Sequence, residues 1–217
     1  MTSPKKLFIP LIDNGMGLSR TSWALCLASA CLGVLRGYNV ILQQLSYSSP
    51  DAALNIAFNL FLQSGADKML LVDTDVVFHE RQIAWLLSHD EPLVFGLYPK
   101  KEPGLIFPME GLTAENPFAE NPLLDGMEPL VEVKRVARGF MCLTTEALKK
   151  LSPLVPEYVD AHTGKVHKEF CRSLPGGHSE DYGFCDLWRK AGGKVLVDQR
   201  CVAQHDGSAL YPIPGTF

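Results

Sequence analysis

Apolar and polar positions repeat with two different periods along this chain, and the alternation predicts strands separated by helices. Short runs rich in β-branched and aromatic residues predict strands at 6–12, 37–42, 68–73, 92–98, 130–136 and 194–198. Apolar residues spaced three and four positions apart predict helices at about 19–35, 50–63, 79–89 and 179–191. Because strands and helices alternate, we expect an α/β fold in which helices connect parallel neighbours through right-handed crossovers.

The helix at 50–63 carries the clearest start and stop signals. Ser49 followed by Pro50 combines an N-cap residue with proline at the first helical position, and Gly65 ends the helix. Its polar residues recur every four positions and predict one polar stripe along the helix, formed by Asp51, Asn55, Asn59 and Gln63. Two later stretches, 99–128 and 152–178, are rich in proline and glycine and are predicted to be loops that close over a substrate.

The chain is organised around the apolar run Met69–Val72, which ends in Asp73 and Asp75. Such a run is typical of a strand buried on both faces, and ligands collect outside the carboxyl ends of such strands. Two carboxylates at that edge are costly to bury unless a positive group lies beside them. A divalent cation that carries a diphosphate meets this need, since carboxylate oxygens suit Mg²⁺ and Mn²⁺. The alternative interpretation is a turn and an N-cap before the next helix.

Composition narrows the class of protein. A chain of 217 residues with a net charge of −4 favours one domain with a sizeable core and gives no general case for nucleic-acid binding. We find no long uncharged apolar segment and no signal-peptide pattern at the N-terminus. The six cysteines form no C-x-x-C pair, so we expect reduced thiols and a cytoplasmic location, in the host cytoplasm if the chain is viral.

Two further polar features lie late in the chain. Ser179, Glu180 and Asp181 follow a glycine-rich loop and open a predicted helix, and His205 comes just after the last predicted strand. Each has a structural alternative, because acidic residues in a first turn complement the helix dipole and a single histidine is commonly a surface or core residue.

In this order, these features resemble the nucleotide-sugar-dependent glycosyltransferases of the GT-A fold, in particular small family-2-like enzymes of bacteria and phages. The resemblance covers nearly the whole chain and is carried by Asn55, 70–78, 96–101, 139–141, 179–185, 188–189 and His205. It implies a single Rossmann-like α/β domain over 1–217, with a mixed, mostly parallel sheet flanked by helices. A nucleotide-binding part would cover about 1–98, an acceptor-side part about 99–205, and a C-terminal tail 206–217.

The resemblance also implies roles for individual residues. The enzyme would transfer a sugar from a nucleoside-diphosphate donor, with UDP favoured, to an acceptor hydroxyl, with inversion and as a single transfer. Mn²⁺ or Mg²⁺ would bind Asp75 and His205, and Asp73 would reach the ribose or a metal-bound water. Asp181 would act as the general base, with Glu180 as the second choice. The implied donor contacts are Pro10, Leu11, Asp13, Asn55, Asp73, Thr74, Arg138 and Gly139.

The chain departs from the family pattern at two points. Leu54 stands where many relatives carry an arginine, and the Q-x-x-R-W motif of processive synthases is missing, which favours single transfer. The acceptor stays open between a saccharide, a lipid-linked sugar and a hydroxylated DNA base, which would have to be extruded from the stack. A DNA acceptor would use the cations Lys100, Lys101, Lys134, Arg135, Lys168 and Arg172.

Other interpretations of the same residues also remain open. A nucleotidyltransferase uses carboxylates and metal on a similar sheet, but its usual glycine-rich basic loop is only faintly matched at 13–20. A non-catalytic nucleotide-sugar-binding module and a retaining mechanism are the further alternatives.

Overall fold

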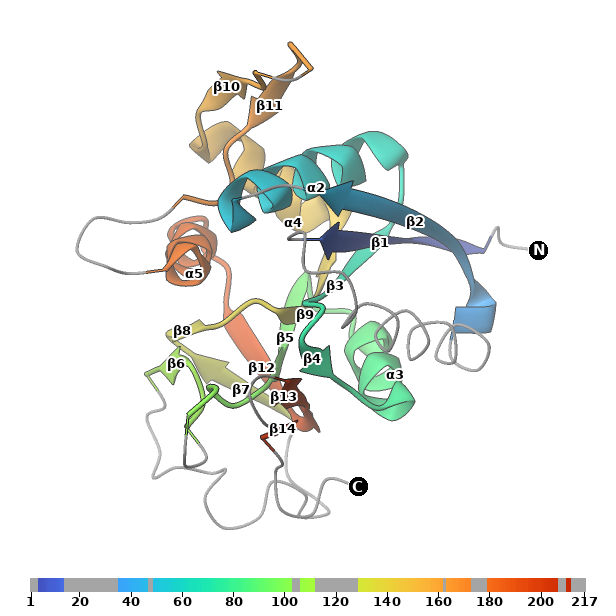
Figure 1. Ribbon diagram of the computed structural model, residues 1–217, viewed down its shortest axis with the longest axis vertical. Helices are drawn as coiled ribbons and strands as arrows, with labels where there is room; N and C mark the ends of the chain where they lie inside the picture. Colours follow the sequence, from blue (N-terminus) through green and yellow to red (C-terminus); the bar gives the residue numbers. More distant parts are fainter. Residues whose placement is uncertain are drawn as a thin grey trace.

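A computed structural model describes residues 4–13, 35–46, 49–102, 106–111, 129–161, 163–172, 179–206 and 210–211. Its centre is a seven-stranded sheet in the order β2-β1-β3-β9-β5-β12-β7 (Figure 1). The strands of this sheet are β1 (Lys5–Asp13), β2 (Tyr38–Ser46), β3 (Lys68–Val72), β5 (Leu93–Leu97), β7 (Leu130–Val133), β9 (Phe140–Thr144) and β12 (Val195–Val202). The helix expected over 19–35 and most of the tail lie outside the described residues.

The strand directions confirm a mixed, mostly parallel sheet. β1 is parallel to both β2 and β3, and β5 is parallel to β12. β9 is antiparallel to both of its neighbours, β3 and β5, and β7 is antiparallel to β12. Five of the seven strands therefore run in one direction. As a result, the carboxyl ends of β3, β5 and β12 and the amino end of β9 meet at one edge of the sheet.

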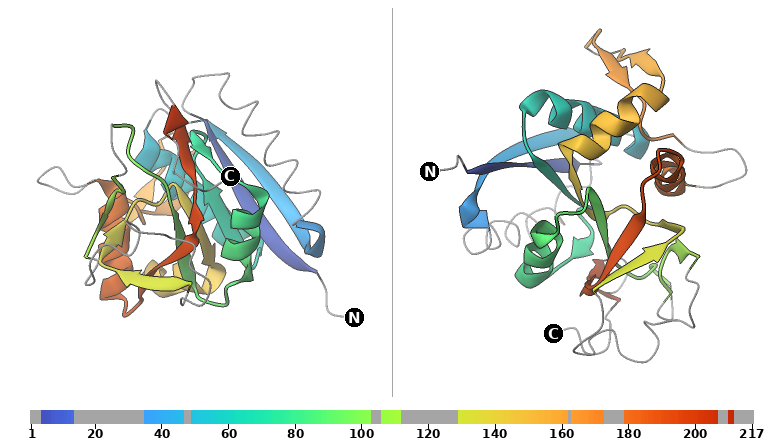
Figure 2. Two further views of the ribbon diagram at one scale, coloured as in Figure 1. Left: turned by 90° about the horizontal axis from the view of Figure 1, so that it is seen from below. Right: turned by 180° about the vertical axis from the view of Figure 1, so that it is seen from behind.

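Helices cover both faces of the sheet (Figure 2). The α-helices of the described part are α2 (Pro50–Ser64), α3 (Glu80–Ser88), α4 (Thr145–Leu151) and α5 (Glu180–Lys190), and two short 3-10 helices are η1 (Leu35–Gly37) and η2 (Ser152–Leu154). Met69 and Leu71 of β3 pack in the core shared with α2, α4 and α5, whereas Leu70 and Val72 pack in the core shared with α3. From Met69 to Val72, β3 is apolar because both of its faces are covered.

α2 begins and ends as predicted, but its polar stripe is not a solvent-exposed face. The helix starts at Pro50 after Ser49 and ends at Gly65 in the left-handed conformation, with φ of 66°. Asn55 and Asn59 are buried. The side-chain amide of Asn55 donates to the carbonyl oxygen of Cys171, after the hairpin β10–β11, and accepts from its N–H. The amide of Asn59 forms the same two hydrogen bonds with the backbone of Lys168, within the hairpin. We call these two residues the asparagine clamp.

The two stretches predicted to be loops contain short strands. β6 (Met109–Glu110) pairs with β8 (Arg135–Val136), and β10 (Glu157–Val159) and β11 (Val166–Lys168) form an antiparallel hairpin. In Figure 1 this hairpin projects from the body of the molecule beyond α2. The prediction of an unstructured stretch over 152–178 was therefore wrong for the hairpin, whose three-residue strands are too short to show a period. No helix among the described residues is long and apolar enough to cross a membrane.

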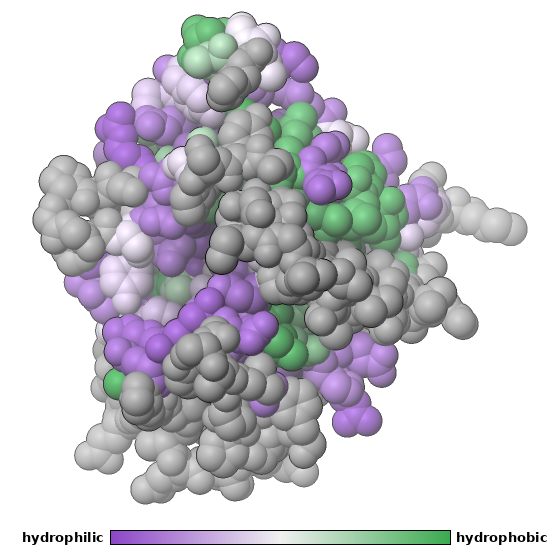
Figure 3. Space-filling model, viewed as in Figure 1, coloured by the Kyte–Doolittle hydropathy of each residue, from purple (hydrophilic) through white to green (hydrophobic). Residues whose placement is uncertain are grey.

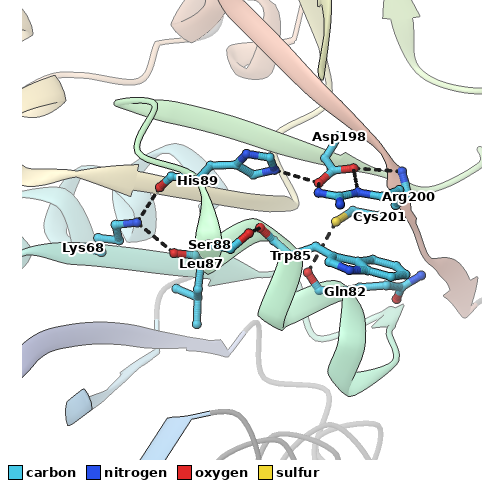
Figure 4. A network of polar contacts seen from close by, with 9 residues as sticks. All are labelled: Lys68, Gln82, Trp85, Leu87, Ser88, His89, Asp198, Arg200 and Cys201. Carbon is cyan, nitrogen blue, oxygen red and sulfur yellow. Dashed lines mark hydrogen bonds and ion pairs between the residues drawn. The ribbon is translucent and has the colours of Figure 1, made fainter. Parts of the chain in front are cut away.

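A buried polar network fixes α3 to the sheet (Figure 4). Lys68 of β3 donates from Nζ to the carbonyl oxygens of Leu87 and His89, at 2.9 and 2.7 Å, which satisfies backbone acceptors at the end of α3. His89 Nε2 lies 2.7 Å from Oδ2 of Asp198 on β12, and Arg200 donates to the same carboxylate. One helix end is thereby joined to two strands.

The edge strand β2 exposes apolar side chains. Val40 and Leu42, which lie on one side of the strand, are 37% and 55% exposed. Figure 3 shows the corresponding apolar area over β2, on the side of the molecule where the described sheet ends.

Candidate functional site

A small sheet brings His205 beside Asp75. β13 (Gln204–Asp206) pairs antiparallel with β4 (Val76–Val77) and with β14 (Leu210–Tyr211), so that His205 lies opposite Val76. The N–H of Asp206 donates to the carbonyl oxygen of Asp75 at 2.7 Å. The structure therefore brings together two predicted metal ligands that lie 130 positions apart in the sequence (205 minus 75).

The Asp75 carboxylate has two nitrogen neighbours. Its Oδ2 lies 3.4 Å from Nε2 of His205 and 2.5 Å from Nζ of Lys101. Burial alone would raise the pKa of Asp75, but hydrogen bonds with His205 and Lys101 outweigh it and lower the pKa to about 2. Asp75 is therefore ionised at neutral pH. Sequence reasoning considered Lys101 only as a DNA contact, because nothing in its local pattern shows that it meets Asp75.

The orientation of His205 is fixed from the end of β5. Nδ1 of His205 lies 2.8 Å from the carbonyl oxygen of Pro99, and a carbonyl oxygen can only accept, so Nδ1 carries the hydrogen. The other ring nitrogen, Nε2, faces Asp75 and can act as a metal ligand when it carries no hydrogen. The ring of Tyr98 packs edge-on against the imidazole, with 4.9 Å between ring centroids. Tyr98 belongs to the matched stretch 96–101, but sequence reasoning assigned it no role.

Asp73 packs against the chain just before β9. Its N–H donates to the carbonyl oxygen of Gly139 at 2.7 Å, and the Gly139 N–H donates to the Tyr98 hydroxyl at 3.1 Å. A Cβ at position 139 would lie 2.4 Å from Oδ2 of Asp73 and 2.5 Å from the Tyr98 hydroxyl oxygen. Burial raises the pKa of Asp73 to about 6; Arg138 lowers it and Asp75 raises it. Gly139 thus permits the close approach of Asp73 and Tyr98.

A buried arginine joins this edge to the start of α5. Arg138 donates from Nη1 to Asp181 Oδ1 at 3.0 Å and from Nη2 to Glu180 Oε1 at 2.8 Å. Its side chain is 4% exposed, and its Nε has no hydrogen-bond partner among the described residues. Burial raises the pKa of Asp181. The positive charge of Arg138 lowers this pKa, and the negative charge of Glu180 raises it further. The two predicted base candidates are therefore held side by side by one guanidinium.

The remaining predicted contacts fall in three places. Pro10, Leu11 and Asp13 lie in the second half of β1, which is parallel to β3, and Thr74 is half-buried in the turn that follows Asp73. Asn55 lies in α2. Its buried amide donates to the carbonyl oxygen of Cys171 and accepts from the Cys171 N–H, both at 2.8 Å. The structure thus shows Asn55 holding the backbone at Cys171, and its predicted donor contact stays a prediction.

The basic residues that were considered for DNA contact are each paired with a carboxylate of the same chain. The pairs are Lys100–Glu102, Lys101–Asp75, Lys134–Glu110, Arg135–Asp186, Lys168–Glu157 and Arg172–Glu169. Since their charges are neutralised locally, the structure gives no support for a DNA-binding surface made by these residues.

The metal-binding atoms at this edge fit a divalent cation whose coordination shell is completed by a bound ligand. Within the described ranges, no three His, Cys, Asp or Glu residues are grouped closely enough to hold a metal ion by themselves. Asp75 and His205 supply one oxygen and one nitrogen, 3.4 Å apart. That separation suits two neighbouring ligands of one ion at about 2.1 Å each. The protein can therefore offer part of a coordination shell, the rest of which other ligands would have to supply.

Comparison with known proteins identifies the fold. No protein-family model and no curated protein sequence matches this chain. Among solved structures, A197 from STIV matches with a TM-score of 0.52 and 16% identity, over 94% of this chain and 86% of that chain. A mutant of Drosophila β-1,4-galactosyltransferase 7, in complex with manganese, UDP-Gal and xylobiose, matches with a TM-score of 0.51 and 10% identity.

The galactosyltransferase match covers 89% of this chain and 65% of the galactosyltransferase chain, so this chain spans just under two thirds of it. At such identities the likeness concerns the fold alone. The chain has a mixed α/β fold similar to that of a GT-A glycosyltransferase.

Proposed function

We propose that this protein is a metal-dependent glycosyltransferase that moves a sugar from a nucleoside-diphosphate donor, with UDP favoured, to an acceptor hydroxyl. The observation that carries the proposal is the convergence of Asp75 and Nε2 of His205 at the carboxyl edge of a GT-A-like sheet. The galactosyltransferase of similar fold is itself a complex with manganese and UDP-Gal, which supports the same donor class here.

Asp75 and His205 would hold Mn²⁺ or Mg²⁺, and the imidazole favours Mn²⁺. When bound, such an ion neutralises the charge that develops on the departing nucleoside diphosphate. Asp73 would contact the ribose or a water bound to the ion. Pro10, Leu11, Asp13 and Thr74 would contact the nucleotide, since β1 runs parallel to β3 and Thr74 directly follows Asp73.

Asp181 would act as the general base that accepts the proton of the acceptor hydroxyl. Burial raises the pKa of Asp181 toward neutral pH, which suits a general base that works close to physiological pH. Arg138 would orient Asp181 and Glu180 through its two terminal nitrogens. Direct attack by the activated hydroxyl on the anomeric carbon of the donor sugar, with the nucleoside diphosphate as leaving group, gives inversion.

A saccharide hydroxyl is the acceptor class that we favour. The galactosyltransferase of similar fold is a complex with xylobiose. The cations that a DNA acceptor would need are held by carboxylates instead.

The proposal is tested by the Asp181→Asn variant, with Glu180→Gln as the matched comparison. We expect donor turnover, measured as release of UDP from UDP-sugars in the presence of Mn²⁺, to fall by about 10²–10⁴-fold in Asp181→Asn. Donor binding should be unchanged, and Glu180→Gln should have the smaller effect. Equal turnover by wild type and Asp181→Asn would contradict the assignment, and binding without any turnover by wild type would indicate a non-catalytic module.

A further inference from the structure

Lys101 places a positive charge at the position where the proposed function needs a cation. Its Nζ lies 2.5 Å from Oδ2 of Asp75, the same oxygen that faces Nε2 of His205 at 3.4 Å. Of the other cations near this edge, Arg138 is held by Glu180 and Asp181, and Lys100 pairs with Glu102. Lys101 is therefore the cation that neutralises Asp75.

An ammonium group and a divalent cation cannot both occupy the same side of Asp75 Oδ2 without strong repulsion. The attraction between Lys101 and Asp75 becomes a repulsion between Lys101 and the ion once an ion binds that oxygen, at only a few ångströms. Metal binding must therefore move the Lys101 side chain. Its flexible four-carbon stem and an exposed fraction of 37% allow this movement.

The backbone next to Lys101 is anchored to the site, which limits where its side chain can go. The carbonyl of Pro99 accepts the His205 Nδ1 hydrogen, and the Lys100 N–H donates to the carbonyl oxygen of Ile106 at 2.8 Å. A displaced Lys101 ammonium thus stays close to Asp75 and to any diphosphate held there, for which a lysine is a common partner.

We propose that Lys101 is an exchangeable counter-ion of Asp75, which competes with the divalent cation when no nucleotide is bound and moves to the diphosphate when both are bound. This inference rests on the proposed function. It assigns two opposite effects to one side chain: Lys101 weakens the binding of metal alone and strengthens the binding of nucleotide once metal is present.

The test uses the full chain with Lys101→Met, and with Lys100→Met as the matched control on the neighbouring residue. Mn²⁺ affinity without nucleotide is measured from the electron paramagnetic resonance signal of free Mn²⁺, and UDP affinity at saturating Mn²⁺ by calorimetry. For Lys101→Met we expect Mn²⁺ to bind about threefold to tenfold more tightly and UDP about threefold to tenfold more weakly. Lys100→Met should change neither affinity, and Lys101→Arg, which keeps the charge, should retain the competition with Mn²⁺.

Two results overturn the inference and leave the proposed function intact. One is an unchanged Mn²⁺ affinity in Lys101→Met, and the other is a parallel loss of Mn²⁺ and UDP binding, which would make Lys101 a structural support of the site. If wild type binds Mn²⁺ neither alone nor with UDP, the proposed metal dependence fails and the inference fails with it.

Discussion

At position 139 a hydrogen atom faces the Asp73 carboxylate and the Tyr98 hydroxyl, at a point where any other residue would place a carbon. We predict that Gly139→Ala lowers the free energy of unfolding by about 1–3 kcal/mol, the usual cost of overpacking. UDP binding should weaken as well, because the added Cβ, at 2.4 Å from Asp73 Oδ2, displaces the carboxylate. Urea denaturation and calorimetry measure the two effects.

Gly37→Ala is the matched control for this prediction. A Cβ at Gly37 would meet no heavy atom within 4 Å, and Gly37 is not among the glycines with positive φ. The control should change neither stability nor UDP binding appreciably. Equal losses in the two variants, or none in Gly139→Ala, would show that close packing at Gly139 does not shape the site.

At the scale of elements, the asparagine clamp of α2 determines how the hairpin is attached. Asn59 donates from Nδ2 to the carbonyl of Lys168 at 2.9 Å, and its Oδ1 accepts from the Lys168 N–H at 3.0 Å. Asn59→Ala would leave both backbone groups without these partners, so we expect a loss of about 1–3 kcal/mol in stability. Amide hydrogen exchange over β10 and β11 should become faster.

Gln63 lies one turn further along the same predicted stripe and is exposed. Gln63→Ala should therefore leave stability and hydrogen exchange in the hairpin nearly unchanged. If both variants behaved alike, the clamp would have no special role in attaching the hairpin.

At the scale of the whole molecule, the buried Asp198 links β12 to α3 and should contribute to the dependence of stability on pH. Burial would raise its pKa, but hydrogen bonds from Arg200 and His89 outweigh burial and lower the pKa below its ordinary value of 3.8. This contribution to stability is therefore complete above the unfolded-state pKa, near 3.9, and is lost as pH falls through the lowered native pKa.

We predict that Asp198→Asn lowers the free energy of unfolding by about 3 kcal/mol at pH 7, since it breaks a buried ion pair. The difference from wild type should begin to shrink below about pH 4, where Asp198 becomes protonated in the unfolded state, and should keep shrinking until the pH falls below the lowered native pKa. Urea denaturation at pH 7 and pH 3 measures this. Asp90→Asn, at an exposed position next to His89, is the control and should stay within about 0.5 kcal/mol of wild type. A constant difference at both pH values would contradict the role of the charge.

The sequence predicted the parts of the fold that depend on local pattern. The apolar run of β3 follows from cores on both faces, and the ends of α2 follow from Ser49, Pro50 and Gly65, so both were predicted from neighbouring residues. Asp73 and Asp75 were placed at the sheet edge because β3 ends there. The short strands of the β10–β11 hairpin carry too few residues to show a period.

The parts of the site that were missed depend on partners far away in the chain. Asn55 is hydrogen-bonded to Cys171, 116 positions further on, and Lys101 pairs with Asp75, 26 positions earlier. Nothing local distinguishes a buried asparagine of this kind from one on a polar helix face. Tyr98 was likewise seen only as part of a matched stretch, because its contacts with Gly139 and His205 arise from the fold.

The most direct test of the central claim is calorimetric binding of UDP, GDP and CDP, each with and without Mn²⁺, to wild type and to Asp75→Ala. We predict that one nucleotide, UDP, binds wild type only when Mn²⁺ is present, and that Asp75→Ala loses this binding because it removes the carboxylate proposed to hold the ion. Asp90→Asn, at an exposed position just after the end of α3, is the control and should bind as wild type does. If no nucleotide binds, or if UDP binds Asp75→Ala as tightly as wild type, the acidic edge is structural and the glycosyltransferase proposal is wrong.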